Sequence, residues 1–207
     1  MADAVAATPD AVADPDAAAS TTAPSKAEIT EKVSVSPAEF SFVKFDAAEI
    51  GEVVVTVAAL VGVPNPIHVE VDETTPLARL MVQVDGTSSD AQVTILAESG
   101  ALEDSQRPTF YGAERTAVAI GRMLLRARDR MRPDFADVEP DHELSVEELA
   151  AWDTYCAGRL SRLGYQMNQQ RWRYNHRNRF GFTDDTDAAF DRLWAAEDIG
   201  WSEVLDP

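Results

Sequence analysis

Two segments of the chain carry hydrophobic residues at helical spacing. Between Gly112 and Met131 the apolar residues recur at steps of three and four, namely Ala113, Ala117, Ile120, Leu124, Ala127 and Met131. Between Leu144 and Gly181 they follow the same kind of pattern, as Leu149, Trp152, Cys156, Leu160, Leu163, Met167 and Tyr174. Ser145 and Glu148 have the spacing of a capping box, and Gly181 is a helix stop. We therefore predict one helix over residues 112–131 and one continuous long helix over residues 144–181.

Three further segments alternate apolar and polar residues, as strands with one buried face do. They are Ile67 to Asp72, Arg79 to Asp85 and Gln92 to Glu98. The connections between them are too short to hold crossover helices, so we expect an antiparallel meander. The valine-rich stretch from Asp46 to Gly62 nevertheless has helical periodicity, and it predicts a helix.

Residues 1–35 are rich in Ala, Asp, Pro and Thr and poor in large apolar side chains, which is typical of a disordered tail. The rest, residues 36–207, is expected to be a single domain that ends in a helix capped by Thr183 and a short turn from Trp201 to Leu205. The predicted fold class is α+β and two-layer. A three-stranded antiparallel sheet is expected to carry the helices, including the long C-terminal helix, on one face.

The charge balance bears on possible partners. The chain has 18 Lys and Arg residues against 36 Asp and Glu residues, for a formal charge of −18. Such a charge disfavours nucleic acid and anionic membranes as partners, unless a local basic patch overrides it. No stretch approaches the length of about 20 apolar residues that a membrane span needs, and the N-terminus does not have the pattern of a signal peptide. The single cysteine, Cys156, is expected in the core. These features predict a cytoplasmic protein.

Templates for catalysis are missing from the sequence. It has no His-Glu-x-x-His, no Walker-type loop, no Gly-x-Gly-x-x-Gly and no Gly-x-Ser-x-Gly. The order helix, three strands, helix resembles that of small zincin-type metalloproteases, but the segment from Ala117 to Gly121 lacks zinc ligands. The acidic run from Asp184 to Asp187 fits a helix start better than a cation loop. We therefore expect neither a catalytic residue, nor a metal site, nor a cofactor.

Arginines follow both predicted helices. Arg115, Arg122, Arg126 and Arg130 are spaced for one surface strip on the first. On the second, the candidate binding residues for an anion or an acidic partner are Arg159, Arg162, Arg171, Trp172, Arg173, His176, Arg177 and Arg179. Two interpretations stay open: a site for a nucleotide or nucleic acid, or ion pairing either with a partner or with the acidic segments 134–148 and 184–191 of the same chain.

Four further motifs carry a family resemblance: Val69 to Leu77, Glu98 to Asp104, Leu124 to Arg128 and Arg177 to Asp184. Through them, residues 67–205 resemble an uncharacterised family of high-GC actinobacteria. The resemblance implies a lineage and carries no activity.

Taken together, these patterns favour a non-enzymatic cytoplasmic interaction or assembly protein with a protein partner. The alternative is a regulatory module that binds an anion or nucleic acid through the arginine and aromatic residues of 159–180. A third hypothesis is a degenerate zincin-like protein without metal.

Overall fold

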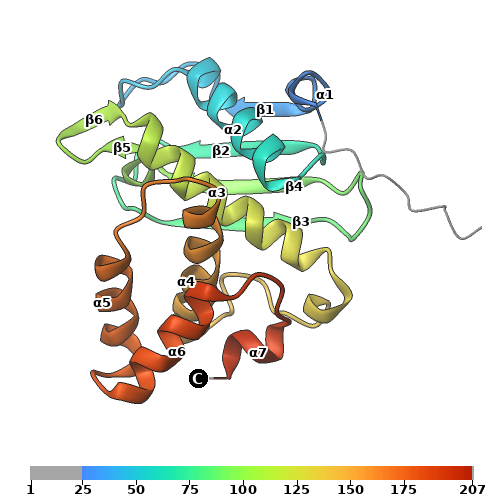
Figure 1. The fold of residues 1–207 in the computed structure, drawn as a ribbon. Helices are drawn as coiled ribbons and strands as arrows, with labels where there is room; N and C mark the ends of the chain where they lie inside the picture. The colour runs from blue at the N-terminus through green and yellow to red at the C-terminus, as the bar shows by residue number, and fades with distance from the viewer. Residues whose placement is uncertain (1–24, 207) are drawn as a thin grey trace, which may run out of the picture.

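The computed structural model describes residues 25–206, and its helices and strands are shown in Figure 1. The strands are β1 Val33–Ser36, β2 Ile67–Asp72, β3 Leu80–Val84, β4 Val93–Glu98, β5 Glu103–Asp104 and β6 Arg107–Tyr111. The helices are α1 Lys26–Thr30, α2 Ala47–Val61, α3 Ala113–Arg130, α4 Val146–Arg162, α5 Gln169–Phe180, α6 Asp184–Ala195 and α7 Trp201–Leu205. Two short 3-10 helices are η1 Ser99–Ala101 and η2 Pro133–Phe135.

The main sheet is mixed and four-stranded, with the order β1-β2-β4-β3, so the prediction of a three-stranded antiparallel sheet is wrong. Strand β4 lies between β2 and β3, parallel to β2 and antiparallel to β3. The two short connections do join strands of opposite direction, as predicted. However, β3 is not next to β2, as it would be in a meander, because β4 lies between them. Strands β2 and β4 are therefore parallel without any crossover helix between them.

The fourth strand comes from the segment that we expected to be a disordered tail. Residues 1–24 of that segment lie outside the described part of the chain, but Ser25 caps α1 and Val33–Ser36 pairs with β2 in parallel. Helix α2 makes the crossover between these parallel strands, as a βαβ unit requires. Ile29 is fully buried, so a few apolar side chains suffice to anchor this segment to the domain.

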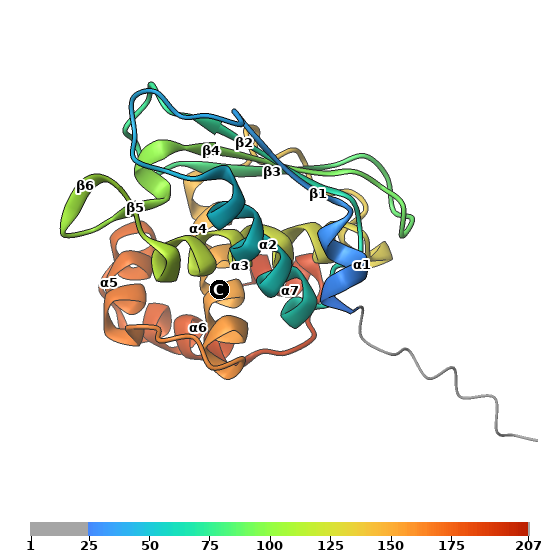
Figure 2. The ribbon, with the colours of Figure 1, turned by 90° about the horizontal axis from the view of Figure 1, so that it is seen from above.

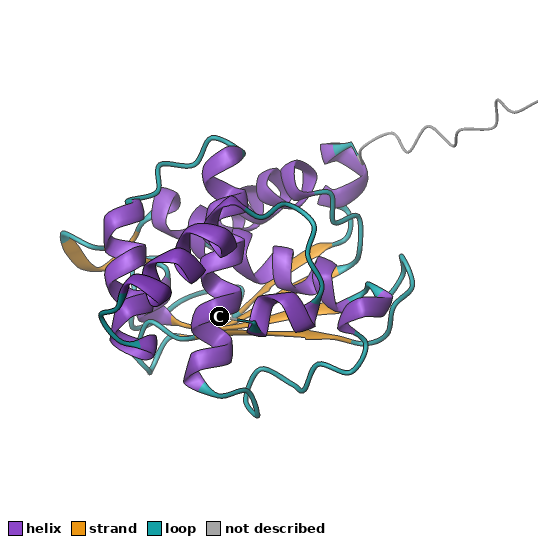
Figure 3. Ribbon diagram, turned by 60° about the horizontal axis from the view of Figure 1, so that its bottom comes forward, coloured by secondary structure: helices purple, strands orange, loops and turns teal. Residues whose placement is uncertain are grey.

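The helices lie on one side of the sheet (Figures 2 and 3). The alternating residues Val69, Val82 and Ile95 are buried beneath α2 and α3. Helix α2 is capped at its start by Asp46, whose carboxylate accepts a hydrogen bond from the Ala48 N–H, and at its end by Gly62 in the left-handed conformation, as predicted. Helix α3 is also confirmed. The second periodic helix differs from expectation, because α4 packs mainly against α3 and the C-terminal helices.

The predicted long helix is broken, which corrects our interpretation of residues 144–181. The capping box at Ser145 is confirmed, but α4 ends at Arg162 and Gly164 has a φ of 95°. Asn168 then caps α5, since its side chain accepts a hydrogen bond from the Arg171 N–H. The predicted apolar stripe ends with α4, because Leu163 and Tyr174 are exposed. The break allows α5 to fold back along α4 (Figure 1).

The C-terminal segments follow the prediction. Thr183 caps α6, and α7 packs on α4, where Trp201 contacts Trp152 and Phe135. Among residues 25–206, no helix is both long enough and apolar enough to span a membrane.

Candidate functional site

The first candidate residue, Arg159 of α4, is buried in an ion pair. Its guanidinium donates two hydrogen bonds to the Asp129 carboxylate of α3, at 2.8 and 2.5 Å. The Trp152 indole N–H donates to the same carboxylate at 2.9 Å. Asp129 is fully buried and Arg159 is 6% exposed. Arg159 therefore holds α4 to α3 and is removed from the candidate binding surface.

The arginine strip of α3 also differs from its prediction. Arg126 is buried and pairs with Asp141 and Asp153, while Arg130 pairs with Asp141 and Arg122 pairs with Asp153. Although desolvation opposes it, the attraction of Asp153 and Asp141 raises the pKa of Arg126. The strip is therefore an internal ion-pair ladder that connects α3 with α4 and the loop before it, and only its first residue, Arg115, is exposed.

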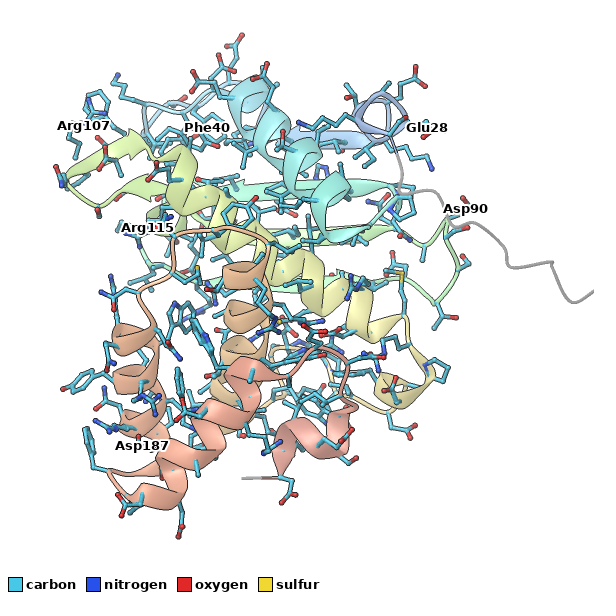
Figure 4. The ribbon with its side chains drawn as sticks, viewed as in Figure 1. Glu28, Phe40, Asp90, Arg107, Arg115 and Asp187 are labelled. Carbon is cyan, nitrogen blue, oxygen red and sulfur yellow. The ribbon has the colours of Figure 1, made fainter. Side chains whose placement is uncertain are left out.

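Three further candidates pair within the chain. Arg173 and Arg177 of α5 bind the carboxylate of Asp187 on α6, and Arg173 also binds Asp191. Arg162 donates hydrogen bonds to the carbonyl oxygens of Trp194 and Ala196. Asp187 lies on α6 beside α5 in Figure 4. The predicted pairing with segment 184–191 is therefore confirmed for two arginines of α5.

The remaining two arginines lie on the other face of α5. Within residues 25–206, no carboxylate lies at ion-pair distance from Arg171 or Arg179, and both side chains are exposed. At about 100° of rotation per residue, they share a sector of about 160° with Trp172, His176 and three asparagines, Asn168, Asn175 and Asn178. Helix α5 is thus neutralised by α6 on one face and left basic on the other.

This basic face forms one wall of a cleft with a volume of about 740 Å³, which we call the α3–α5 cleft. Its other walls come from α3, α4, β3 and the segment around η1. The residues that line it are Ala78, Leu80, Ala101, Ser105, Glu114, Arg115, Val118, Ala119, Arg122, Ala150, Asp153, Thr154, Gln166, Met167, Asn168, Arg171, Trp172, Asn175, His176, Asn178 and Arg179. Arg115 lies near the start of α3, toward the β5–β6 hairpin (Figure 4). The lining contains four arginines and two carboxylates, in a chain whose formal charge is −18.

Trp172 is a wall of the cleft rather than an open stacking platform. The Arg122 guanidinium carbon lies 5.4 Å from the centre of its ring. Arg122 is itself fixed by a hydrogen bond of 2.6 Å to Asp153 of α4. The chain Trp172, Arg122, Asp153 therefore joins α5, α3 and α4, and a cation–π contact of this kind stabilises by about 0.5 to 2 kcal/mol.

His176 lines the cleft and is 2% exposed. Thr154 donates its only hydroxyl hydrogen to the Ala150 carbonyl oxygen, so its oxygen accepts from Nδ1 of His176 at 3.4 Å. The proton of the neutral ring is thus on Nδ1, and Nε2 is a buried acceptor without a partner among the described residues. Desolvation lowers the pKa of His176 to about 4, despite the nearby Asp187 carboxylate.

The lowered pKa predicts acid sensitivity. As pH falls from about 6.5 to about 4, the unfolded chain binds a proton at His176 and the folded chain does not, so the free energy of unfolding decreases by about 1 to 3 kcal/mol from this residue. A His176→Gln variant is expected to lose less stability over this interval than the parent chain. Urea unfolding at pH 7 and pH 4.5 measures the difference. The exposed His142→Gln is the control, and an equal loss in parent and His176→Gln would contradict the assignment.

Cys156 is fully buried on α4, and burial raises the pKa of its thiol to about 11, which suits a core residue. Within the described residues, His, Cys, Asp and Glu side chains do not gather in threes as metal ligands would.

Sequence reasoning missed part of the cleft. It included Arg171, Trp172, His176 and Arg179 but not Arg115 and Arg122 as members of the same site, nor the asparagines of α5. A signal was present, since Asn168, Arg171, Asn175, Asn178 and Arg179 recur at steps of three, four and one after Gly164. Comparison of the chain with protein-family models, with curated proteins and with solved structures returned no match, so the resemblance to an actinobacterial family stays a prediction.

Proposed function

We propose that this chain is a non-enzymatic cytoplasmic interaction protein that holds an anionic group of its partner in the α3–α5 cleft. One observation carries the proposal: Arg171 and Arg179 face the cleft without a carboxylate partner among residues 25–206, although carboxylates outnumber basic groups two to one in the chain. Of the other two arginines that line the cleft, Arg122 pairs with Asp153, and Arg115 donates a hydrogen bond to the Gly100 carbonyl oxygen.

Physical chemistry favours an anion at this place. Guanidinium groups bind carboxylates and phosphates through paired hydrogen bonds, and such charge-assisted bonds are stronger than neutral ones. The surrounding negative surface restricts access for long polyanions, while a single anionic group needs only the cleft. Arg115 contributes a third exposed guanidinium, with one nitrogen donating to the Gly100 carbonyl oxygen at 3.1 Å.

Inorganic pyrophosphate is a suitable probe of the site. We expect it to bind the full chain at low salt, and we expect Arg171→Ala and Arg179→Ala each to weaken binding by about tenfold, which corresponds to about 1.4 kcal/mol. Isothermal titration calorimetry measures the affinity. The exposed Arg107→Ala, which removes a guanidinium outside the cleft, is the matched control.

Two results would overturn the proposal. One is the absence of binding at about 50 mM salt, where contacts to phosphate are strong. The other is an equal loss of affinity in Arg107→Ala and in the two cleft variants, because that would indicate attraction by the overall field instead of by the cleft.

A further inference from the structure

The arrangement of polar side chains along α5 indicates the chemistry of the occupant. We infer that the α3–α5 cleft binds an extended acidic segment of a partner protein, with two carboxylates four residues apart. This inference rests on the proposed function and adds to it the class of partner and the spacing of its charges.

The spacing comes from the helix itself. Arg171 and Arg179 are eight residues apart on α5, which places their Cα atoms about 12 Å apart along the axis at 1.5 Å per residue. An extended chain advances about 3.3 Å per residue, so residues four positions apart are separated by about 13 Å. These positions also have side chains on the same face of the extended segment, since side chains alternate. Two carboxylates at this spacing can therefore reach both arginines at once.

The asparagines explain why the occupant would be a peptide. Asn175 and Asn178 lie between or beside the two arginines on the cleft-lining face, and both are exposed. An amide side chain offers two N–H donors and one carbonyl acceptor. The backbone of an extended peptide offers the complementary N–H and C=O groups at every residue, and it needs partners when it is removed from water. The asparagine side chains that lie between the two arginines can therefore form hydrogen bonds with the peptide backbone that lies between the two carboxylates.

The charge distribution disfavours nucleic acid in the same cleft. A strand carries a phosphate at each nucleotide, and it would continue beyond the cleft over Glu114 on α3 or the carboxylates at the start of α6. The stacking that single strands use also meets a Trp172 ring already contacted by Arg122. A short acidic segment ends within the cleft, so its two carboxylates need only the positive charges of Arg171 and Arg179.

Fluorescence polarisation with labelled peptides tests the inference on the full chain. The probe contains the sequence Glu-Ser-Thr-Ser-Glu, and the comparison peptide has the same composition with the two glutamates adjacent. We expect the spaced peptide to bind about tenfold more tightly, and we expect Arg171→Ala or Arg179→Ala to abolish this preference. Asn175→Ala combined with Asn178→Ala should weaken binding of the spaced peptide severalfold, with circular dichroism confirming the fold.

The outcomes separate this inference from the proposed function. If pyrophosphate binds through Arg171 and Arg179 but the two peptides bind equally, the anion site stands and the spaced peptide is wrong. If a single-stranded oligonucleotide binds more tightly than the spaced peptide at equal salt, the inference is overturned in favour of nucleic acid. If neither pyrophosphate nor peptide binds, both proposals fail.

Discussion

Replacing Asp129 by alanine is expected to lower the free energy of unfolding by about 3 to 5 kcal/mol, because it leaves the buried Arg159 charge without its counter-ion. The same change removes the acceptor of the Trp152 indole N–H. Burying an uncompensated guanidinium is costly in a low-dielectric interior, and Arg159 is too enclosed by α3 and α4 to turn toward water. Urea unfolding followed by tryptophan fluorescence measures the loss.

Two control variants distinguish the effect of the buried charge from the effect of removing any carboxylate. Asp191→Ala removes a carboxylate that is mostly exposed, and the loss is expected to stay below about 1 kcal/mol. A double variant, Asp129→Ala with Arg159→Met, removes both charges and should recover part of the stability lost by Asp129→Ala. A loss below about 1 kcal/mol in Asp129→Ala would contradict the role of this pair.

Gly158→Ala is expected to destabilise the protein by about 3 kcal/mol, although alanine is the better helix former. A Cβ atom at this position of α4 would lie 2.1 Å from the Trp194 carbonyl oxygen of α6, so the two helices would have to separate. The Trp194 carbonyl group belongs to the backbone and cannot move aside as a flexible side chain can. Overpacking of this kind costs about 1 to 3 kcal/mol or more. The melting temperature and the urea midpoint measure the effect.

Gly51→Ala is the matched control within another helix. A Cβ atom there meets only Val35, at 4.0 Å, which is an ordinary contact. The substitution is expected to stabilise the protein by about 0.5 to 1 kcal/mol, because alanine has the higher helix propensity. If both substitutions stabilise the chain equally, the close approach of α4 and α6 is wrong.

Part of the candidate site could be predicted and part could not. The basic and aromatic composition of residues 171–179 is a property of the sequence, and it located one wall of the α3–α5 cleft. Which arginines remain available depends on neighbours: Arg173 and Arg177 form ion pairs with carboxylates of α6, whereas Arg171 and Arg179 do not. To predict which arginines are paired, one must know where carboxylates from distant parts of the chain lie, such as Asp129 beside Arg159 and Asp153 beside Arg122.

Hydrophobic periodicity and capping residues by themselves determined α2, α3, α6 and the start of α4, because these signals depend on residues that are close together in the sequence. They also determined β2, β3 and β4, whose alternating residues must face one core. Only the tertiary structure decided that β4 lies between β2 and β3, that Val33–Ser36 adds a fourth strand, and that the long helix breaks at Gly164. The physical reason is that strand pairing and ion pairing join residues far apart in sequence, and the gain from burying them together outweighs the local preferences that a pattern records.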